Sequence, residues 1–187
     1  MRQVGRINLN KFEEKTVLSQ PIFKGRVISL KVDDVLLPNG EMAKREVVNH
    51  PGAVAIIALT DAGKLLVVEQ YRKALERSII EIPAGKLEPG EKPEVTAKRE
   101  LEEETGYTCG ELTYLQTFAT SPGFADEIIH LFVARKLIPL KEKAALDDDE
   151  FVELMEVTLE EAEEMMTSGA IYDAKTAYAV MWLKNQK

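Results

Sequence analysis

The sequence is poor in cysteine and histidine, and this limits the chemistry that it can support. Cys109 is the single cysteine among 187 residues, so an internal disulfide framework and a cysteine-based metal site are excluded. Such cysteine usage is typical of a reducing compartment, and we expect a cytoplasmic protein. Cys109 is expected to be a small buried side chain. The two histidines, His50 and His130, are expected to have structural roles.

Long apolar runs and basic stretches are also missing. No run approaches the roughly 18 residues of a membrane-spanning helix, and the N-terminus lacks the apolar stretch of a signal peptide. The 24 Lys and Arg residues are outnumbered by 32 Asp and Glu residues, which gives a net charge of −8. Because no basic block offsets that charge, neither nucleic acid nor membrane is expected as a partner. An anionic substrate would therefore have to be met by bound metal and a few arginines.

Glutamates, by contrast, are concentrated between residues 91 and 104, where six of them occur. A helix is predicted to begin at Pro93, which suits a first helical position, and to end before Gly106. At 100° per residue, one arc of about 100° carries three carboxylates, those of Glu100, Glu103 and Glu104. Ala97 and Leu101 lie beside this arc and are predicted to face a core.

Such a face repels itself, and Arg99 can offset part of the repulsion through Glu103, four residues further on. Hard carboxylate oxygens on one rigid face are the ligands that Mg²⁺ or Mn²⁺ accepts. Taken alone, the same pattern is also explained by a solvated acidic surface.

The spacing around this helix adds a second observation. Gly85, five residues, Glu91, seven residues and then the run Arg99–Tyr107 (RELEEETGY) fill every fixed position of the signature of the Nudix hydrolases. The chain resembles this family. The resemblance implies an α/β fold, a mixed sheet in an α/β/α sandwich over about residues 45–187. It further implies a bound Mg²⁺, with Mn²⁺ as an alternative, and a set of metal ligands: the Ala84 carbonyl, Glu100, Glu103 and Glu104. Arg99 and Glu103 are assigned to the catalytic set.

Residues 1–44 form a separate N-terminal segment by their pattern. After a polar stretch over residues 1–15, strands are predicted over Val17–Phe23, Val27–Leu37 and Met42–Val48, with a hairpin turn at Pro38-Asn39-Gly40. In the ADP-ribose pyrophosphatase branch of the family, an antiparallel sheet of this kind is exchanged or packed between two subunits. The resemblance therefore implies a homodimer in which this sheet helps to form the substrate pocket. The alternative is a small sheet packed on its own domain.

The remaining segments fit a mixed sheet covered by helices. Ala53–Leu59 and Lys64–Tyr71 flank a tight polar turn and are predicted to form a hairpin of central strands, covered on both faces. Pro83-Ala84-Gly85 is predicted to be a loop, and residues 141–150 a charged connection. Further strands are predicted over residues 77–82, 111–119, 127–134 and 151–157. Helices are predicted from a capping box at Thr158 to Gly169 and from Asp173 to Trp182.

The loop over residues 121–127 resembles the ADP-ribose pyrophosphatase subgroup. Pro122 and Gly123 match its loop and are expected to bind substrate, although a plain turn is an alternative. Glu127 has the spacing of the glutamate that activates the attacking water. Asp126 and Glu103 are rivals for this role, and Glu127 is otherwise an exposed residue at the start of a strand.

Substrate-binding residues are expected outside the signature. Arg72 leaves a central strand and could pair with a phosphate, or form a surface salt bridge with Glu76 or Glu81. Glu81 could contact the terminal ribose or a metal-bound water. Arg45 and Phe23 could stack on an adenine base, and the alternatives are a solvated arginine and a core phenylalanine.

These assignments together predict a Mg²⁺-dependent hydrolase. The expected reaction is cleavage of the diphosphate of ADP-ribose to AMP and ribose 5-phosphate, without a covalent enzyme intermediate. Another Nudix activity, on NADH, a nucleotide sugar or a dinucleoside polyphosphate, is the first alternative. A module that senses ADP-ribose without cleaving it is the second, although such modules usually lose carboxylates that are present here.

Overall fold

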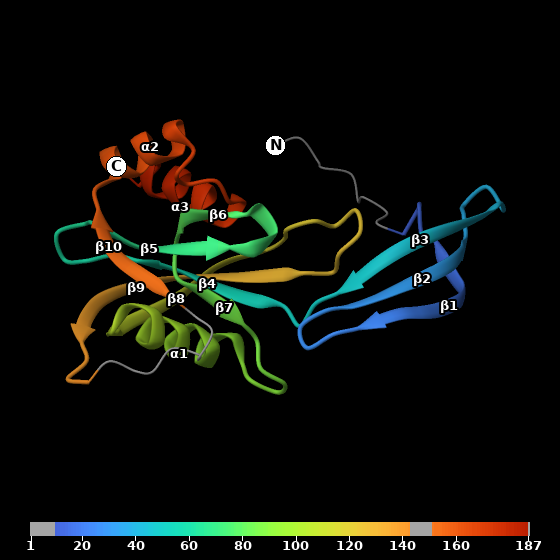
Figure 1. Cartoon of the computed structure of the whole chain (residues 1–187), viewed down its shortest axis with the longest axis horizontal. Coiled ribbons are helices and arrows are strands. Elements are labelled where there is room, and N and C mark those ends of the chain that lie inside the picture. The colour runs from blue at the N-terminus through green and yellow to red at the C-terminus, as the bar shows by residue number, and fades with distance from the viewer. Residues whose placement is uncertain (1–9, 143–150, 187) are drawn as a thin grey trace, which may run out of the picture. The chain divides into compact units, whose positions relative to one another are not determined.

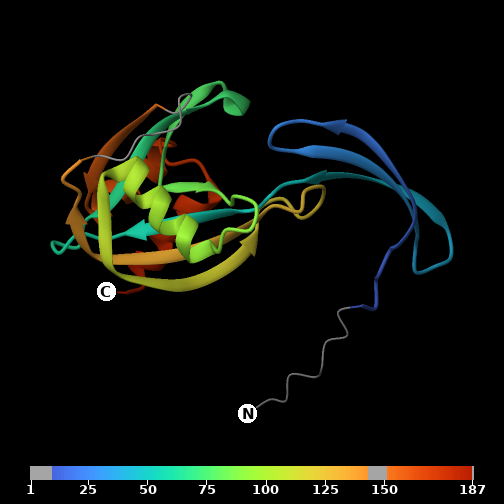
Figure 2. The same ribbon diagram turned by 90° about the horizontal axis from the view of Figure 1, so that it is seen from below.

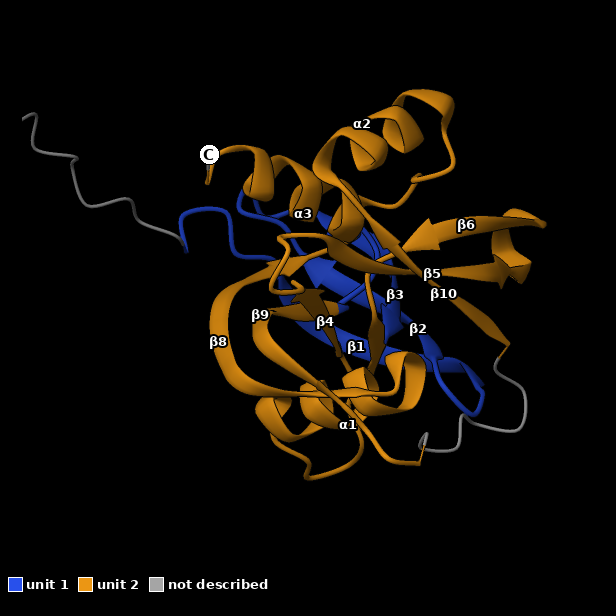
Figure 3. Ribbon diagram, turned by 90° about the vertical axis from the view of Figure 1, so that its left-hand side faces the viewer, with its two compact units in different colours: residues 1–50, 121–127 blue, residues 51–120, 128–187 orange. Residues whose placement is uncertain are grey.

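The computed structural model describes residues 10–142 and 151–186. The chain divides into two compact units, residues 1–50 with 121–127 and residues 51–120 with 128–187 (Figure 3). The predicted polar end over residues 1–15 and the charged connection over 141–150 lie largely outside the described residues. Each unit has its own sheet structure.

The first unit is an antiparallel sheet of three strands in the order β1-β2-β3. Its strands are β1 (Lys15–Lys24), β2 (Ser29–Leu36) and β3 (Met42–Asn49), as the sequence predicts, and β1 and β2 follow a common curve (Figure 2). Gly40 has a positive φ of 87° in the predicted hairpin turn. The loop 121–127 joins this unit, because the Val48 N–H donates to the Phe124 carbonyl at 2.8 Å and the Asp126 N–H donates to the Val48 carbonyl at 3.1 Å.

The second unit contains two sheets (Figure 1). One has the order β10-β5-β6 and is antiparallel; the other has the order β7-β4-β9-β8 and is mixed, since β4 runs parallel to β9 and antiparallel to β7. The strands are β4 (Ala53–Ala58), β5 (Leu65–Arg72), β6 (Arg77–Glu81), β7 (Ala84–Lys86), β8 (Tyr107–Ala119), β9 (Ile128–Pro139) and β10 (Val152–Val157).

Helices cover these sheets on opposite sides, α1 (Pro93–Thr105) on one and α2 (Leu159–Ser168) with α3 (Ala174–Lys184) on the other (Figure 3). Alternate residues of β4 enter different cores. Ala55 and Ile57 pack in the core under α2 and α3, whereas Val54 and Ile56 pack in the core under α1. The predicted mixed α/β/α sandwich, with central strands buried on both faces, is confirmed.

Two local predictions were wrong. The runs that become β4 and β5 do not form a hairpin in one sheet: each strand belongs to a different sheet, and an isolated bridge between Leu59 and Leu65 joins them. Both runs are apolar on both faces, so their pattern does not specify a pairing partner. The predicted loop at Pro83–Gly85 leads into strand β7, because Ala84 and Gly85 find unpaired backbone groups at the edge of β4.

The helix ends follow the sequence signals. Pro93 is the first residue of α1, and Gly106 ends it in the left-handed conformation at φ 73°. Thr158 and Glu161 form the predicted capping box of α2, and Asp173 caps α3. Within the described ranges, no helix is both long and apolar enough to cross a membrane.

Candidate active site

Helix α1 buries two chemically different faces. Ala97 and Leu101 are fully buried in the core, as predicted. Glu100 and Glu104 are also buried, with only 6% and 2% of their surfaces exposed. Carboxylates are rarely buried to this degree unless they are paired, so a solvated acidic surface does not describe these two residues. They form the centre of the candidate site.

Strand β7 is shaped to receive these carboxylates. A methyl group at Gly85 would lie 1.9 Å from the carboxylate carbon of Glu100, so the glycine leaves the space that this group occupies. The Ala84 N–H donates to Glu104 Oε2 at 3.1 Å. The glycine of the signature is therefore explained by close approach between the backbone of β7 and a side chain of α1.

Arg99 is shared by three carboxylates of the signature. Its Nη1 donates to Glu100 at 2.8 Å and to Glu103 at 2.9 Å, and its Nη2 donates to Glu91 at 3.2 Å. Burial opposes the charge of the guanidinium, but the bonds to Glu91 and the charges of Glu100 and Glu103 outweigh it and raise the pKa of Arg99. The predicted pair with Glu103 is confirmed and is part of a larger cluster.

The donor chemistry of this cluster fits a divalent cation. Among the described residues, no three His, Cys, Asp or Glu side chains already form a metal-binding group. The carboxylates of Glu100 and Glu103 turn to Arg99, and that of Glu104 turns to Ala84. Three carboxylates nevertheless share one guanidinium, and this excess of hard anionic oxygens is suited to Mg²⁺ or a similar ion.

A second charged cluster lies at the ends of β5 and β6. Arg72 holds Glu81 with a two-pronged contact, Nε to Oε1 at 2.5 Å and Nη2 to Oε2 at 3.0 Å. The salt bridge with Glu81 that the sequence left open is thus present, whereas Glu76 bonds to Tyr71 and Lys73. Burial of Glu81 favours its neutral form, but the bonds and charges of Arg72 and Lys175 prevail and lower the pKa of its carboxyl.

Lys175 is a member of this cluster that the sequence analysis did not identify. It is 8% exposed, and its Nζ donates to Glu81 Oε2 and, at 2.9 Å, to Asp173 Oδ2. Asp173 was expected only as a helix cap. A lysine two residues after a helix cap is ordinarily solvated. The one sequence signal for its burial would have been a helical pattern that places Lys175 and Thr176 on the buried face, where both lie.

The other predicted residues belong to the first unit. Arg45 donates to both oxygens of Glu14, at 2.6 and 2.7 Å, and so has a salt-bridge partner. Phe23 is 56% exposed and is not a core residue of the described chain. Pro122 and Gly123 are exposed in the loop.

Glu127 and Asp126 have different surroundings at the end of that loop. Asp126 accepts hydrogen bonds from Asn49 Nδ2 and from the His50 N–H, both at 2.7 Å, and the bond from Asn49 is the main cause of its lowered pKa. Glu127 keeps 30% of its side chain exposed and lies 3.6 Å from His50 Nδ1. These contacts weaken Asp126 as a rival base, because both of its oxygens are already committed.

Cys109 and His130 have the surroundings of structural residues. Burial raises the pKa of the Cys109 thiol, which suits a structural residue. His130 Nδ1 lies 2.9 Å from Thr117 Oγ1.

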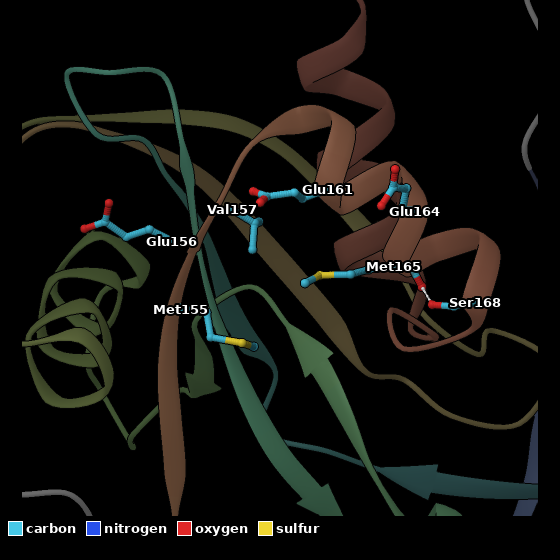
Figure 4. Close-up of a pocket in the computed structure, with 7 residues that line it drawn as sticks. All are labelled: Met155, Glu156, Val157, Glu161, Glu164, Met165 and Ser168. Atoms are coloured by element: carbon cyan, nitrogen blue, oxygen red, sulfur yellow. Dashed lines mark hydrogen bonds between the residues drawn. The ribbon is translucent and has the colours of Figure 1, made fainter.

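A hollow of about 610 Å³ lies between β10 and α2 (Figure 4), and its described lining includes no residue of either charged cluster. Met155 and Met165 project into it, and its described lining also includes Glu156, Glu161 and Glu164. An anionic diphosphate would meet these three carboxylates, so this hollow is a poor candidate for the substrate site.

Comparison with known proteins places these features in a family. A model of the NUDIX domain matches residues 49–177. Over 176 residues, 94% of this chain and 95% of each relative, the sequence is 61% identical to an ADP-ribose pyrophosphatase of Bacillus subtilis and to a methanol dehydrogenase activator of Bacillus methanolicus. A solved ADP compounds hydrolase shares the fold with a TM-score of 0.80 at 22% identity, covering 93% of this chain and 96% of that chain.

Proposed function

This chain belongs to the Nudix family, and we propose from that premise that it hydrolyses ADP-ribose. Water adds at one phosphorus of the diphosphate, and the bridging P–O bond breaks to give AMP and ribose 5-phosphate. The observation that carries the proposal is the buried carboxylate face of α1, where Glu100 and Glu104 lie against β7. The 61% identity to a relative named ADP-ribose pyrophosphatase supports this substrate.

Glu100, Glu103, Glu104 and the Ala84 carbonyl would hold the divalent cation, which we propose to be Mg²⁺. Such an ion, when bound, neutralises diphosphate oxygens and lowers the pKa of a coordinated water. Arg99 holds Glu100 and Glu103 on one side of the helix and limits their mutual repulsion. Ala84 fixes one oxygen of Glu104 through its N–H.

The remaining roles are assigned by chemistry and spacing. We propose Glu127 as the general base from its spacing after Ser121-Pro122-Gly123, and because both oxygens of its rival Asp126 accept hydrogen bonds, from Asn49 and His50. Arg72, anchored by Glu81, would bind the diphosphate. The adenine base would be bound by Phe23, Arg45, Pro122 and Gly123.

We also propose that the protein is a homodimer of the cytoplasm. All ten residues of β1 are exposed in the single chain, and its apolar members Val17, Leu18, Ile22 and Phe23 are each more than half exposed. An apolar strand of this kind calls for a covering surface, and a second copy of the chain would supply one. Cys109 is a free thiol, which suits the reducing cytoplasm.

A substrate panel with Mg²⁺ tests the activity. The kcat/KM values for ADP-ribose, NADH, GDP-mannose, FAD and diadenosine polyphosphates would be compared, with AMP identified as a product. We expect a clear preference for ADP-ribose and loss of turnover when EDTA removes the metal. Preference for another compound would retain the diphosphate chemistry but replace the substrate, and no turnover of any compound would support the sensing module.

Glu104→Gln tests the metal-binding role. The glutamine oxygen can still accept the Ala84 N–H, so the melting temperature should stay close to that of the wild type. Loss of the charge should lower kcat by a factor of about 10² or more, as for removal of one group that stabilises the charge of a transition state. Near-normal turnover by this variant would contradict the assignment.

A second function is favoured by the equally similar relative named methanol dehydrogenase activator. We propose that the same hydrolytic site could serve to activate a dehydrogenase. Adding the protein to a methanol dehydrogenase would raise the turnover of that dehydrogenase in that case, and Glu104→Gln would abolish the increase.

A further inference from the structure

The first turn of helix α3 contributes Lys175 to the second charged cluster. Lys175, in its first turn, contacts Glu81 and Asp173, and Glu81 also contacts Arg72. We call these four residues the α3 charge cluster. It holds two cations and two carboxylates. A lysine that is 8% exposed is stable only when its charge is met by partners of this kind.

The backbone ties the same turn of α3 to the end of β6. The Ile82 N–H donates to Thr176 Oγ1 at 3.0 Å. Asp173 Oδ2 accepts the Thr176 N–H at 3.2 Å as well as the ammonium of Lys175. Glu81 is therefore held on a fixed strand end and bonded to a lysine on a fixed helix end, so the carboxylate has little freedom to turn.

The fixed Glu81 carboxylate in turn fixes the guanidinium of Arg72. A guanidinium has five N–H groups in a planar fork, and two of those of Arg72 are donated to Glu81. Within the part of the chain that the structure describes, the other three have no acceptor. The side chain is 40% exposed, so the remaining donors can reach a ligand that arrives from solvent. Planar guanidinium groups with free paired donors are well suited to phosphate oxygens.

Lys175 is what makes this arrangement stable. Without its charge, the buried Glu81 carboxylate would have Arg72 as its one cationic partner in the cluster. The carboxylate would then be free to rotate toward the guanidinium and to engage N–H groups of Arg72 that it does not contact now. In the wild-type chain, Oε2 of Glu81 is fixed because it accepts hydrogen bonds from both Arg72 Nη2 and Lys175 Nζ.

We propose that Lys175 is a positioning residue for substrate binding. It anchors the Glu81 carboxylate from the core side and thereby keeps three N–H groups of Arg72 available to the substrate diphosphate. Lys175 does not itself touch the substrate. This inference rests on the proposed function, since it assumes that Arg72 binds the diphosphate.

Lys175→Met tests the proposal by separating KM from kcat. The methionine fills a similar volume without charge. We expect KM for ADP-ribose to rise about tenfold with kcat within about threefold of wild type, the pattern of lost ground-state binding. Lys184→Met is the matched control: Lys184 lies on the same helix in an exposed pair with Glu163, and KM should not change. Unchanged KM in Lys175→Met, even with a lowered melting temperature, would overturn the proposal.

A double-mutant cycle tests the route through Glu81. In a Glu81→Gln background, Lys175→Met should change KM by less than about twofold, because its partner is already altered. An undiminished tenfold effect in that background would show that Lys175 acts by another route. If Lys175→Met alone does not fold, the comparison of Glu81→Gln with the double variant still decides the question, since that pair removes both charges together.

Binding measurements distinguish failure of this inference from failure of the proposed function. Calorimetric titration of ADP-ribose into Glu104→Gln and into Glu104→Gln/Lys175→Met requires no turnover. A Kd about tenfold weaker in the second protein supports the role of Lys175 even if the wild type prefers to cleave another diphosphate. Equal Kd values overturn it, whatever the substrate panel shows.

Discussion

At the scale of single residues, the candidate site requires that Gly85 has no side chain. Gly85 has a negative φ, so its backbone conformation would accept any residue. A glycine is needed there because a Cβ would lie 1.9 Å from the carboxylate carbon of Glu100. The carboxylate is 6% exposed and bonded to Arg99, so it cannot move aside without losing that ion pair.

Gly85→Ala should therefore displace Glu100. We expect kcat/KM to fall by about 10² and the free energy of unfolding to fall by about 1–3 kcal/mol, as for overpacking of a well-filled site. Steady-state kinetics and urea unfolding measure the two effects. An alanine variant with wild-type activity would mean that Glu100 can be repositioned without loss, and the tight approach would then have no catalytic meaning.

At the scale of secondary-structure elements, α2 depends on its N-terminal cap. Thr158 Oγ1 accepts the Glu161 N–H at 3.2 Å, and Glu161 Oε2 accepts the Thr158 N–H at 2.7 Å. The cap satisfies donors that an isolated helix end leaves unpaired. Leu159 and Ala162, both buried, fasten the helix to the core that it shares with α3.

Thr158→Ala should lower the free energy of unfolding by about 1 kcal/mol, the usual cost of losing a threonine cap. Thr167→Ala is the control on the same helix, because Thr167 Oγ1 bonds to the Glu163 carbonyl away from the cap. Chemical unfolding would measure both variants. A loss of equal size in Thr167→Ala would indicate that the cap has no special contribution. Activity should be unchanged in each case, since neither residue belongs to the charged clusters.

At the scale of the whole molecule, the sheet of the first unit is the feature that calls for a partner. Its β1 strand is exposed along its whole length, and Leu18 is 61% exposed. If two copies of the chain cover this surface, the protein should sediment at twice the chain mass of 20.9 kDa.

Leu18→Asp should then shift the sedimentation equilibrium toward the monomer, because a desolvated carboxylate without a partner is costly in an interface. Thr113→Asp places the same charge at an exposed strand position of the second unit and should leave the mass unchanged. A wild-type protein that sediments as a monomer at micromolar concentration would rule out the proposed homodimer.

The sequence by itself determined the features that rest on local chemistry. Pro93 and Gly106 mark the ends of α1, and the spacing of Glu100 and Glu104 places both on one helix face, because helix geometry depends on neighbours within a few residues. The signature identified the family for the same reason: its positions lie close together in the chain.

The tertiary structure alone decided which distant segments meet. The apolar runs of β4 and β5 gave no information on their pairing, since residues buried on both faces fit either sheet. Nothing near Lys175 in the chain indicates that it reaches Glu81, 94 residues away. The depth at which Glu100 and Glu104 lie was likewise set by the approach of β7. Burial and ion pairing of these groups are properties of packing between elements, which a local pattern does not encode.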